Sequence, residues 1–181
     1  MNIDGFWEIV DRVNIDSNGV MDEKCELLKE ELMSLANDEI ISFSKHFNEL
    51  NIKAYSWELW AAAYILNGGC SDDSFSDFRA TLISMGAKIF SVALKDPNSL
   101  GTVEFDDNDP CYEGYQYVIN DVLEEKLGEL PQCSITFPEN PFGVEWDEDT
   151  VENLYPSLKC LDEVEPAQCN SEKNKPWWKF W

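Results

Sequence analysis

Cys70 is the residue whose type and position first suggest catalysis, because it directly precedes a predicted helix start. A helix N-terminus stabilises a thiolate, which is the nucleophilic form of cysteine. A cysteine nucleophile also needs a base, and His46 is the only histidine in the chain. Nothing in the sequence directs His46 toward Cys70, and two acidic neighbours, Asp72 and Asp73, oppose formation of a thiolate. We therefore expect Cys70 to be a buried structural cysteine.

The carboxylates that follow Cys70 are candidates for binding a hard cation, because calcium and magnesium prefer oxygen ligands. Asp72, Asp73 and Asp77 lie here, but they lack the alternating order of a calcium-binding loop. Capping of the next helix by Ser71, Asp72 and Asp73 explains these short polar side chains without a metal. No zinc spacing, phosphate-binding glycine motif or nucleophile elbow occurs. The sequence therefore predicts neither a metal site nor a cofactor.

Glu58 and Arg79 flank the same segment and could pair across two helices. A buried ion pair that holds the helix geometry is the simpler interpretation, and a catalytic site is the alternative. An enzyme of unknown reaction would have its site near Trp60, Asp72, Asp73 and Arg79. With a single histidine in the chain, such an enzyme would have to rely on carboxylates or on Arg79.

Apolar residues at helical spacing predict the elements that must position these side chains. The apolar stripes lie at residues 6–13, 21–35, 40–50, 57–66, 75–85 and 112–127. Residues 57–66 are apolar on nearly every side, so we expect this helix to be the central one, with Trp57 and Trp60 in the core. Asp4 is expected to cap the first helix. Strict alternation of apolar and polar residues is absent, and the predicted fold class is all-α.

Changes of composition divide the chain into three parts. Residues 1–130 are predicted to form a compact multi-helix domain. Residues 131–171 are acidic and rich in proline, and we expect an irregular extension packed on that domain, with one short helix at 147–154. Residues 172–181 form an aromatic and basic tail. We expect its tryptophans to be anchors that dock on this protein's own body, the preferred alternative, or on a partner; they are Trp177, Trp178 and Trp181.

The formal net charge of −23 is concentrated in residues 104–171, which carry 18 acidic side chains against two lysines. Such a field repels phosphate backbones and anionic lipid surfaces, so we expect neither nucleic acid nor a membrane as partner. A basic protein partner is favoured, although acidity can also serve solubility alone. The predicted partner-binding residues form two clusters, Glu104, Asp106, Asp107 and Asp109, and Glu145, Asp147, Glu148 and Asp149.

Two segments in succession resemble a known bacterial family. The first is Trp57-Glu58-Leu59-Trp60-Ala61-Ala62-Ala63-Tyr64, and the second runs from Gly68 through Cys70-Ser71-Asp72-Asp73 to Gly86. Both resemble the family catalogued as domain of unknown function number 4240, and the resemblance extends from about Phe6 to about Leu127. Some members of that family are immunity proteins of antibacterial toxins, so the resemblance implies the same role for this chain.

Three functions are compatible with these observations. The first is an immunity protein that blocks the active site of a cognate toxin, such as an ADP-ribosyltransferase or another NAD- or nucleic-acid-directed toxin, by tight stoichiometric binding. The second is the enzyme described above, and the third is a regulatory protein-binding scaffold. Six cysteines without a Cys-x-x-Cys pair, and an N-terminus without signal-peptide features, predict a cytoplasmic location.

Overall fold

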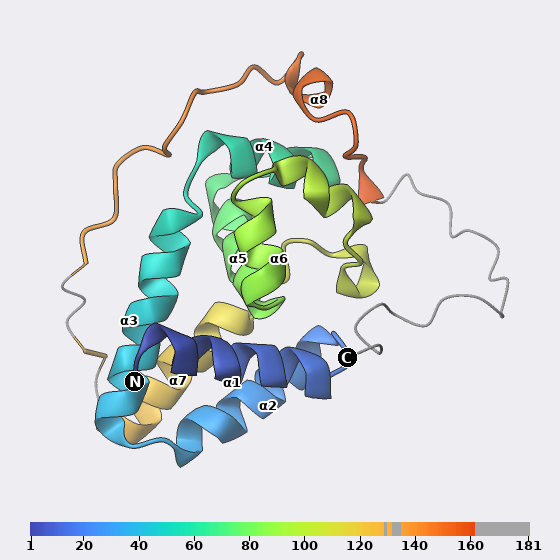
Figure 1. The fold of residues 1–181 in the computed structure, drawn as a ribbon. Helices are drawn as coiled ribbons and strands as arrows, with labels where there is room; N and C mark the ends of the chain where they lie inside the picture. Colours follow the sequence, from blue (N-terminus) through green and yellow to red (C-terminus); the bar gives the residue numbers. More distant parts are fainter. Residues whose placement is uncertain (129, 132–134, 162–181) are drawn as a thin grey trace, which may run out of the picture.

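The computed structural model describes residues 1–128, 130–131 and 135–161 of the chain (Figure 1). All regular secondary structure in these residues is helical, apart from an isolated bridge between Ser56 and Phe142. The predicted all-α fold is therefore confirmed. The elements in chain order are α1 (Ile3–Asp16), α2 (Met21–Ser34), α3 (Asn37–Lys53), α4 (Trp57–Leu66), α5 (Asp72–Ser84), α6 (Ala87–Ala93), the 3₁₀ helices η1 (Pro97–Thr102) and η2 (Asp106–Asn108), α7 (Tyr115–Leu127) and α8 (Val151–Leu154).

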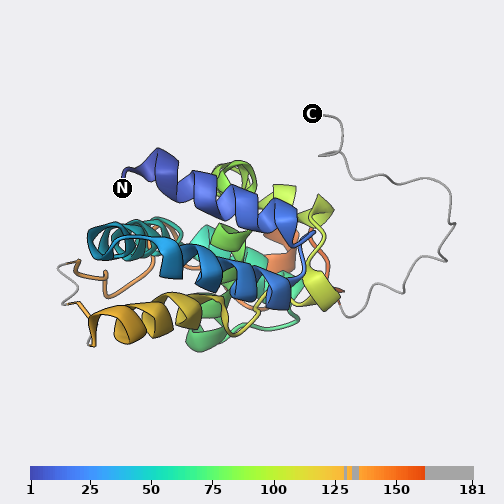
Figure 2. The same cartoon turned by 90° about the horizontal axis from the view of Figure 1, so that it is seen from below.

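The helices pack in layers around α5. Figure 2 shows α1 and α7 on opposite sides of the body, with α2 and α3 between them. α5 packs against α1, α3, α4, α6 and α7, and every side chain from Phe78 to Ser84 is buried. The central helix is therefore α5. The prediction from the composition of residues 57–66, that α4 is the central helix, is wrong. α4 lies at one side of the body, against α5, η1 and α8.

Helix caps explain where α1 and α5 begin. The side chain of Asn2 accepts a hydrogen bond from the N–H of Gly5 at 2.9 Å, so Asn2 and not Asp4 is the N-cap of α1. Asp4 lies inside the first turn, where its charge favours the positive end of the helix dipole. Ser71 caps α5 as predicted, because its Oγ accepts the N–H of Ser74 at 3.2 Å.

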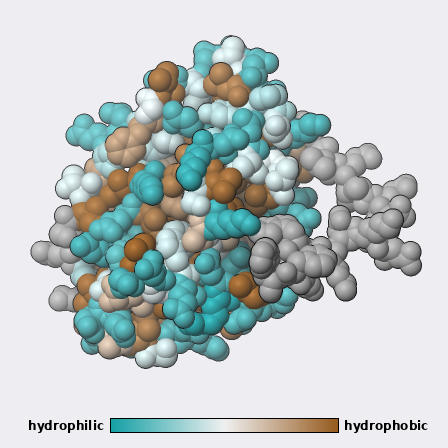
Figure 3. All heavy atoms as spheres, viewed as in Figure 1, coloured by the Kyte–Doolittle hydropathy of each residue, from teal (hydrophilic) through white to brown (hydrophobic). Residues whose placement is uncertain are grey.

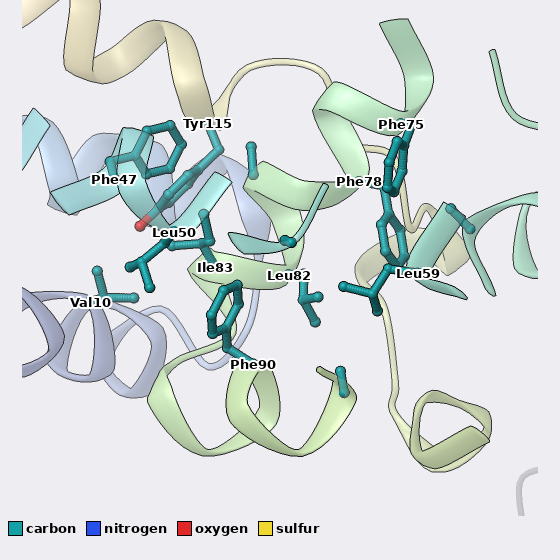
Figure 4. Packing of buried hydrophobic residues seen from close by; sticks show 14 of the residues in the cluster. Val10, Phe47, Leu50, Leu59, Phe75, Phe78, Leu82, Ile83, Phe90 and Tyr115 are labelled. Atoms are coloured by element: carbon teal, nitrogen blue, oxygen red, sulfur yellow. The ribbon is translucent and has the colours of Figure 1, made fainter. Parts of the chain in front are cut away.

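The core contains a buried tyrosine whose polar atom lacks a partner. Figure 4 shows Tyr115 packed with Phe47 and Leu50, while Phe75 and Phe78 extend the cluster along α5. The side chain of Tyr115 is 1% exposed, and its hydroxyl has no hydrogen-bond partner among the described residues. A buried hydroxyl without a partner costs free energy of folding, because its hydration is lost and not replaced.

Residues 135–161, which we call the C-terminal extension, run along the outside of the body and over α4 (Figure 1). Val151 of α8 is fully buried and Leu158 is 5% exposed, so apolar side chains pack the extension on the helical body. Ser157 donates its N–H to the Asn98 side chain in η1 at 3.4 Å. The short helix predicted at 147–154 is present as α8. The division of the chain at residues 130 and 171 stays a prediction.

Hydrophilic residues cover most of the face seen in Figure 3, and apolar residues form small separate patches there. Polar and charged groups therefore supply most of the surface that a partner would meet on this face. None of the helices in the described ranges has the length and apolar character needed to cross a bilayer.

Candidate functional site

The open side of α4 carries three aromatic side chains at helical spacing. The helix begins after Ser56, whose Oγ accepts the N–H of Leu59 at 3.2 Å. Leu59 and the alanines of α4 face the core, whereas Trp57, Trp60 and Tyr64 are only half-buried. The prediction that Trp57 and Trp60 belong to the core is therefore wrong for Trp57, whereas the half-buried Trp60 packs against the core. Among the described residues, the C-terminal extension is the segment that faces this side of α4, and it leaves the three rings partly accessible.

Trp60 lies between Trp57 and Phe75 in a stack of three nearly parallel rings. The ring centroids of Trp57 and Trp60 are 5.3 Å apart with planes at 9°, and those of Trp60 and Phe75 are 4.9 Å apart with planes at 12°. The indole N–H of Trp60 donates to the carbonyl of Cys70 at 3.0 Å. Phe75 is fully buried, so the stack leads from the core to the surface and Trp57 is its outermost ring.

Trp146 of the C-terminal extension faces these rings. Its indole N–H donates to the carbonyl of Trp57 at 2.9 Å. Its ring stands nearly perpendicular to Trp57, at 88° and 6.2 Å, and lies 5.0 Å from the ring of Tyr64. Just before it, the N–H of Phe142 donates to the carbonyl of Tyr55 at 2.9 Å, and the N–H of Trp57 donates to the carbonyl of Phe142 at 2.8 Å. These backbone bonds hold the extension in register with α4.

The rings and the acidic segment that follows enclose an open groove of about 550 Å³. We call it the aromatic groove, and it is lined by Trp57, Trp60, Tyr64, Cys70, Glu145, Trp146, Asp147, Glu148 and Asp149. Its four carboxylates are exposed, and no ion pair joins them to any basic side chain that the structure describes. No such basic side chain lines the groove. The aromatic groove therefore combines ring faces with uncompensated negative charge.

Tyr64 connects the aromatic and the acidic parts of the groove. Burial raises the pKa of Tyr64, and the charge of Glu148 and a hydrogen bond to Glu148 raise it further. The phenol consequently stays neutral and serves as a hydrogen-bond donor to Glu148.

Cys70 lines the aromatic groove and is half-buried, so the prediction of a buried cysteine is wrong. Its thiol donates to the carbonyl of Ser71 at 3.5 Å. The neighbouring thiol of Cys111 has a raised pKa, mainly through its hydrogen bond with Cys70 and then through burial. The ring of His46 lies 3.3 Å from the carboxylate of Glu49, on α3. The structure therefore gives Cys70 a second thiol as its neighbour and no imidazole base.

Arg79 is buried in the body and does not pair with Glu58, which is exposed. Its guanidinium donates to the carbonyls of Phe75, at 3.2 Å, and of Asn51, at 3.1 Å. It also lies 4.9 Å from the centre of the Tyr55 ring, and burial lowers its pKa. The predicted ion pair is therefore absent. Backbone carbonyls and aromatic ring faces bind the Arg79 guanidinium instead, and Glu58 is exposed to solvent.

The residues of the predicted enzyme alternative do not form one site. Trp60 lines the aromatic groove, whereas Arg79 lines a second cavity of about 100 Å³ between α3, α5 and α7. Asp72 and Asp73 are exposed in the first turn of α5 and line neither cavity. Within the described ranges, no group of three or more histidine, cysteine, aspartate or glutamate side chains is placed to hold a metal ion.

Asp77 is a carboxyl group in acidic surroundings on α5. It accepts a hydrogen bond from the side chain of Gln116 at 2.8 Å. Burial, followed by the charges of Glu113, Asp73 and Asp109, raises the pKa of Asp77 to about 6. Ionisation of Asp77 at neutral pH therefore opposes folding.

The first predicted acidic cluster is partly used within the fold. Asp106 accepts the N–H of Met21 at 2.8 Å, and Asp109 accepts a backbone N–H two residues further on at 2.8 Å. Glu104 and Asp107 are exposed. In the second cluster all four carboxylates are exposed at the aromatic groove. The structure thus brings aromatic rings together with the second cluster.

Three groove residues, Trp57, Tyr64 and Trp146, were not among the predicted site residues. The sequence signal for Trp146 is its position as a single aromatic residue inside the acidic run Glu145-Trp146-Asp147-Glu148-Asp149. An acidic run is drawn to solvent, so a tryptophan within it indicates a local anchor on the body. The three predicted anchors near the C-terminus lie outside the described residues; they are Trp177, Trp178 and Trp181.

Comparison with known proteins finds a family match that includes the α4 residues of the aromatic groove. Residues 1–125 match the family described as "Protein of unknown function (DUF4240)". Comparisons with curated proteins and with solved structures gave no match. The matched residues include α4 and Cys70, and they end before the extension that supplies Trp146 and the acidic rim. Because the match spans well over half of the sequence and all helices from α1 to α6, the chain belongs to the DUF4240 family.

Proposed function

We propose that this chain is an immunity protein that neutralises a cognate antibacterial toxin by tight, stoichiometric binding over the toxin's active site. The observation that carries the proposal is the aromatic groove with its four exposed carboxylates. Tryptophan is a typical anchor residue of protein interfaces, where a few residues supply most of the binding energy. The net charge of −23 adds long-range attraction for a basic partner.

The class of toxin follows from the sign of the charge. Enzymes that act on NAD or on nucleic acids bind phosphate groups with basic residues, so their active sites present positive charge. An ADP-ribosyltransferase or another NAD- or nucleic-acid-directed toxin therefore fits an acidic inhibitor. Resemblance to a family that includes immunity proteins supports the same role. We place the encounter in the cytoplasm of the cell that carries both genes.

Titration of a purified toxin domain, encoded by the neighbouring gene, with this protein tests the proposal. Residual toxin activity should fall in proportion to the added protein and reach zero at about a one-to-one ratio, as tight binding requires. If a catalytic amount of the protein restores the function of target that is already damaged, the protein is an enzyme and the binding mechanism is wrong.

Charge variants show whether the rim of the groove is the surface that binds. The triple variant Asp147→Asn, Glu148→Gln, Asp149→Asn should slow association with the toxin and weaken its dependence on salt, because rim charges act mainly on encounter. The matched control removes three exposed carboxylates from α1 and α2, namely Glu8→Gln, Glu26→Gln and Glu30→Gln. Both variants change the net charge equally. Equal effects in both would assign the attraction to overall charge and not to the groove.

A further inference from the structure

The chemistry of the aromatic groove specifies what kind of group can occupy it. Its charged side chains are all carboxylates, which accept hydrogen bonds, so a ligand must supply donors and positive charge. The faces of tryptophan and tyrosine rings also attract cations through the ring quadrupole. Both halves of the groove therefore select for a cation, and neither half favours an anion or a neutral acceptor.

We infer that the aromatic groove binds the guanidinium group of an arginine side chain presented by a protein partner. This inference deepens the proposed function and rests on it, since it names the chemistry by which the groove recognises a basic toxin. Charge complementarity identifies the partner as cationic, and the geometry of the rings distinguishes arginine from lysine.

A planar cation suits the stack of rings that forms the floor of the groove. The planes of Trp57 and Trp60 are 9° apart, and Trp146 stands at 88° to Trp57 as a side wall. Guanidinium is flat and weakly hydrated, so it stacks on an indole face, while a lysine ammonium is compact and strongly hydrated. The stacked guanidinium still directs N–H groups outward in its own plane, where the Glu148 and Asp149 carboxylates of the rim can accept them.

The groove is organised before a ligand arrives. The indole N–H groups of Trp60 and Trp146 already donate to the carbonyls of Cys70 and Trp57, at 3.0 and 2.9 Å. Neither indole N–H is therefore free for a ligand. Because Trp57 and Phe75 cover the two faces of Trp60, the indole faces offered to a ligand are those of Trp57 and Trp146. Binding then loses little side-chain entropy, because the rings are fixed by the core and by backbone bonds.

Capped tetra-arginine and tetra-lysine peptides, titrated calorimetrically into the full chain, test the inference. Overall charge attracts both peptides equally, so their affinity ratio isolates what the planar guanidinium adds once it is stacked on Trp57. We expect the arginine peptide to bind about fivefold more tightly, and Trp57→Ala to abolish this preference. Tyr117→Ala is the matched control, because Tyr117 is an exposed ring on α7, a helix that contributes no residue to the groove lining, and its hydroxyl donates to the carboxylate of Glu113 at 3.3 Å. Trp57→Phe should retain part of the preference.

Three results would overturn the inference. Equal affinity for both peptides, or an arginine preference that survives Trp57→Ala, would show that charge alone attracts the partner. If neither peptide binds until Trp177, Trp178 and Trp181 are replaced by alanine, the chain's own tail occupies the groove.

The toxin titration separates this inference from the proposed function. One-to-one neutralisation that Trp57→Ala leaves unchanged would keep the immunity role and refute the arginine site. Failure of neutralisation together with a groove-dependent arginine preference would refute the toxin as partner and sustain the chemistry of the groove.

Discussion

Replacement of Lys24 by methionine should stabilise the protein at neutral pH. Lys24 lies on α2 with only 2% of its side chain exposed, and its ammonium reaches the hydroxyl of Ser84 at 3.4 Å. Burial lowers the pKa of Lys24 to about 8, although the nearby charge of Asp106 opposes this shift. Methionine retains an unbranched apolar side chain of similar length and removes the charge.

The size of the effect follows from the pKa. A lysine that titrates near 8 in the folded chain and near 10.5 in the unfolded chain destabilises the folded state by about 3 kcal/mol at neutral pH. This cost is complete below about pH 8. It declines between about pH 8 and pH 10.5, because the folded chain releases its proton before the unfolded chain does. Loss of the hydrogen bond to Ser84 reduces the expected gain in Lys24→Met to about 2 kcal/mol at pH 7.

Urea denaturation of wild type and Lys24→Met at about pH 7 and about pH 9.5 measures the gain in unfolding free energy and its decline with pH. The advantage of the variant should shrink by about 2 kcal/mol at the higher pH. Lys29→Met on the same helix is the control, because Lys29 is half-exposed and pairs with Glu125 at 3.4 Å. Its stability difference from wild type should be small at both pH values. An advantage of Lys24→Met that is the same at both pH values would refute the reasoning.

Three further changes test other parts of the fold. Tyr115→Phe removes a buried hydroxyl without a partner, and calorimetry should show a gain of about 1 kcal/mol in unfolding free energy. Asp77→Asn should stabilise the protein above about pH 6 and lose this advantage toward about pH 4, because ionisation of Asp77 opposes folding only within and above that range. Denaturation at several pH values measures it, and a constant advantage would contradict the raised pKa. Gly101→Ala places a methyl group against the Ser157 carbonyl and should cost about 1 to 3 kcal/mol by displacing the extension from η1, while Thr102→Ala next to it should have little effect in the same urea denaturation.

Helices with a one-sided apolar stripe were predictable from sequence. In α1, the predicted face of Phe6, Ile9, Val10 and Val13 is the buried face. In α4 the same reasoning failed, because residues that are apolar on all sides carry no signal for which side faces the core. That side is determined by segments far away in the chain, which pack against the helix.

The negative charge of the candidate site was predictable from the sequence, but the contacts that bring its residues together were not. The acidic residues Glu145, Asp147, Glu148 and Asp149 were predicted to bind a partner because net charge is a property of composition, and this stays a prediction. Their position beside Trp57 depends on a hydrogen bond between residues 89 positions apart in the sequence, and local patterns do not encode such contacts. The same limitation applies to Asp106, whose bond to Met21 spans 85 positions and uses a carboxylate that composition alone assigns to the surface.

The two walls of the aromatic groove differ in how strongly the fold constrains them. Trp60 is stacked on the fully buried Phe75, so a change in this wall alters core packing. The opposite wall consists of exposed carboxylates around Trp146, outside the residues that match the family. Surface substitutions of this kind change stability by no more than about 0.5 kcal/mol. We therefore expect substitutions of the carboxylates at positions 145 and 147–149 to leave the fold intact, provided that Trp146 keeps the segment anchored on α4.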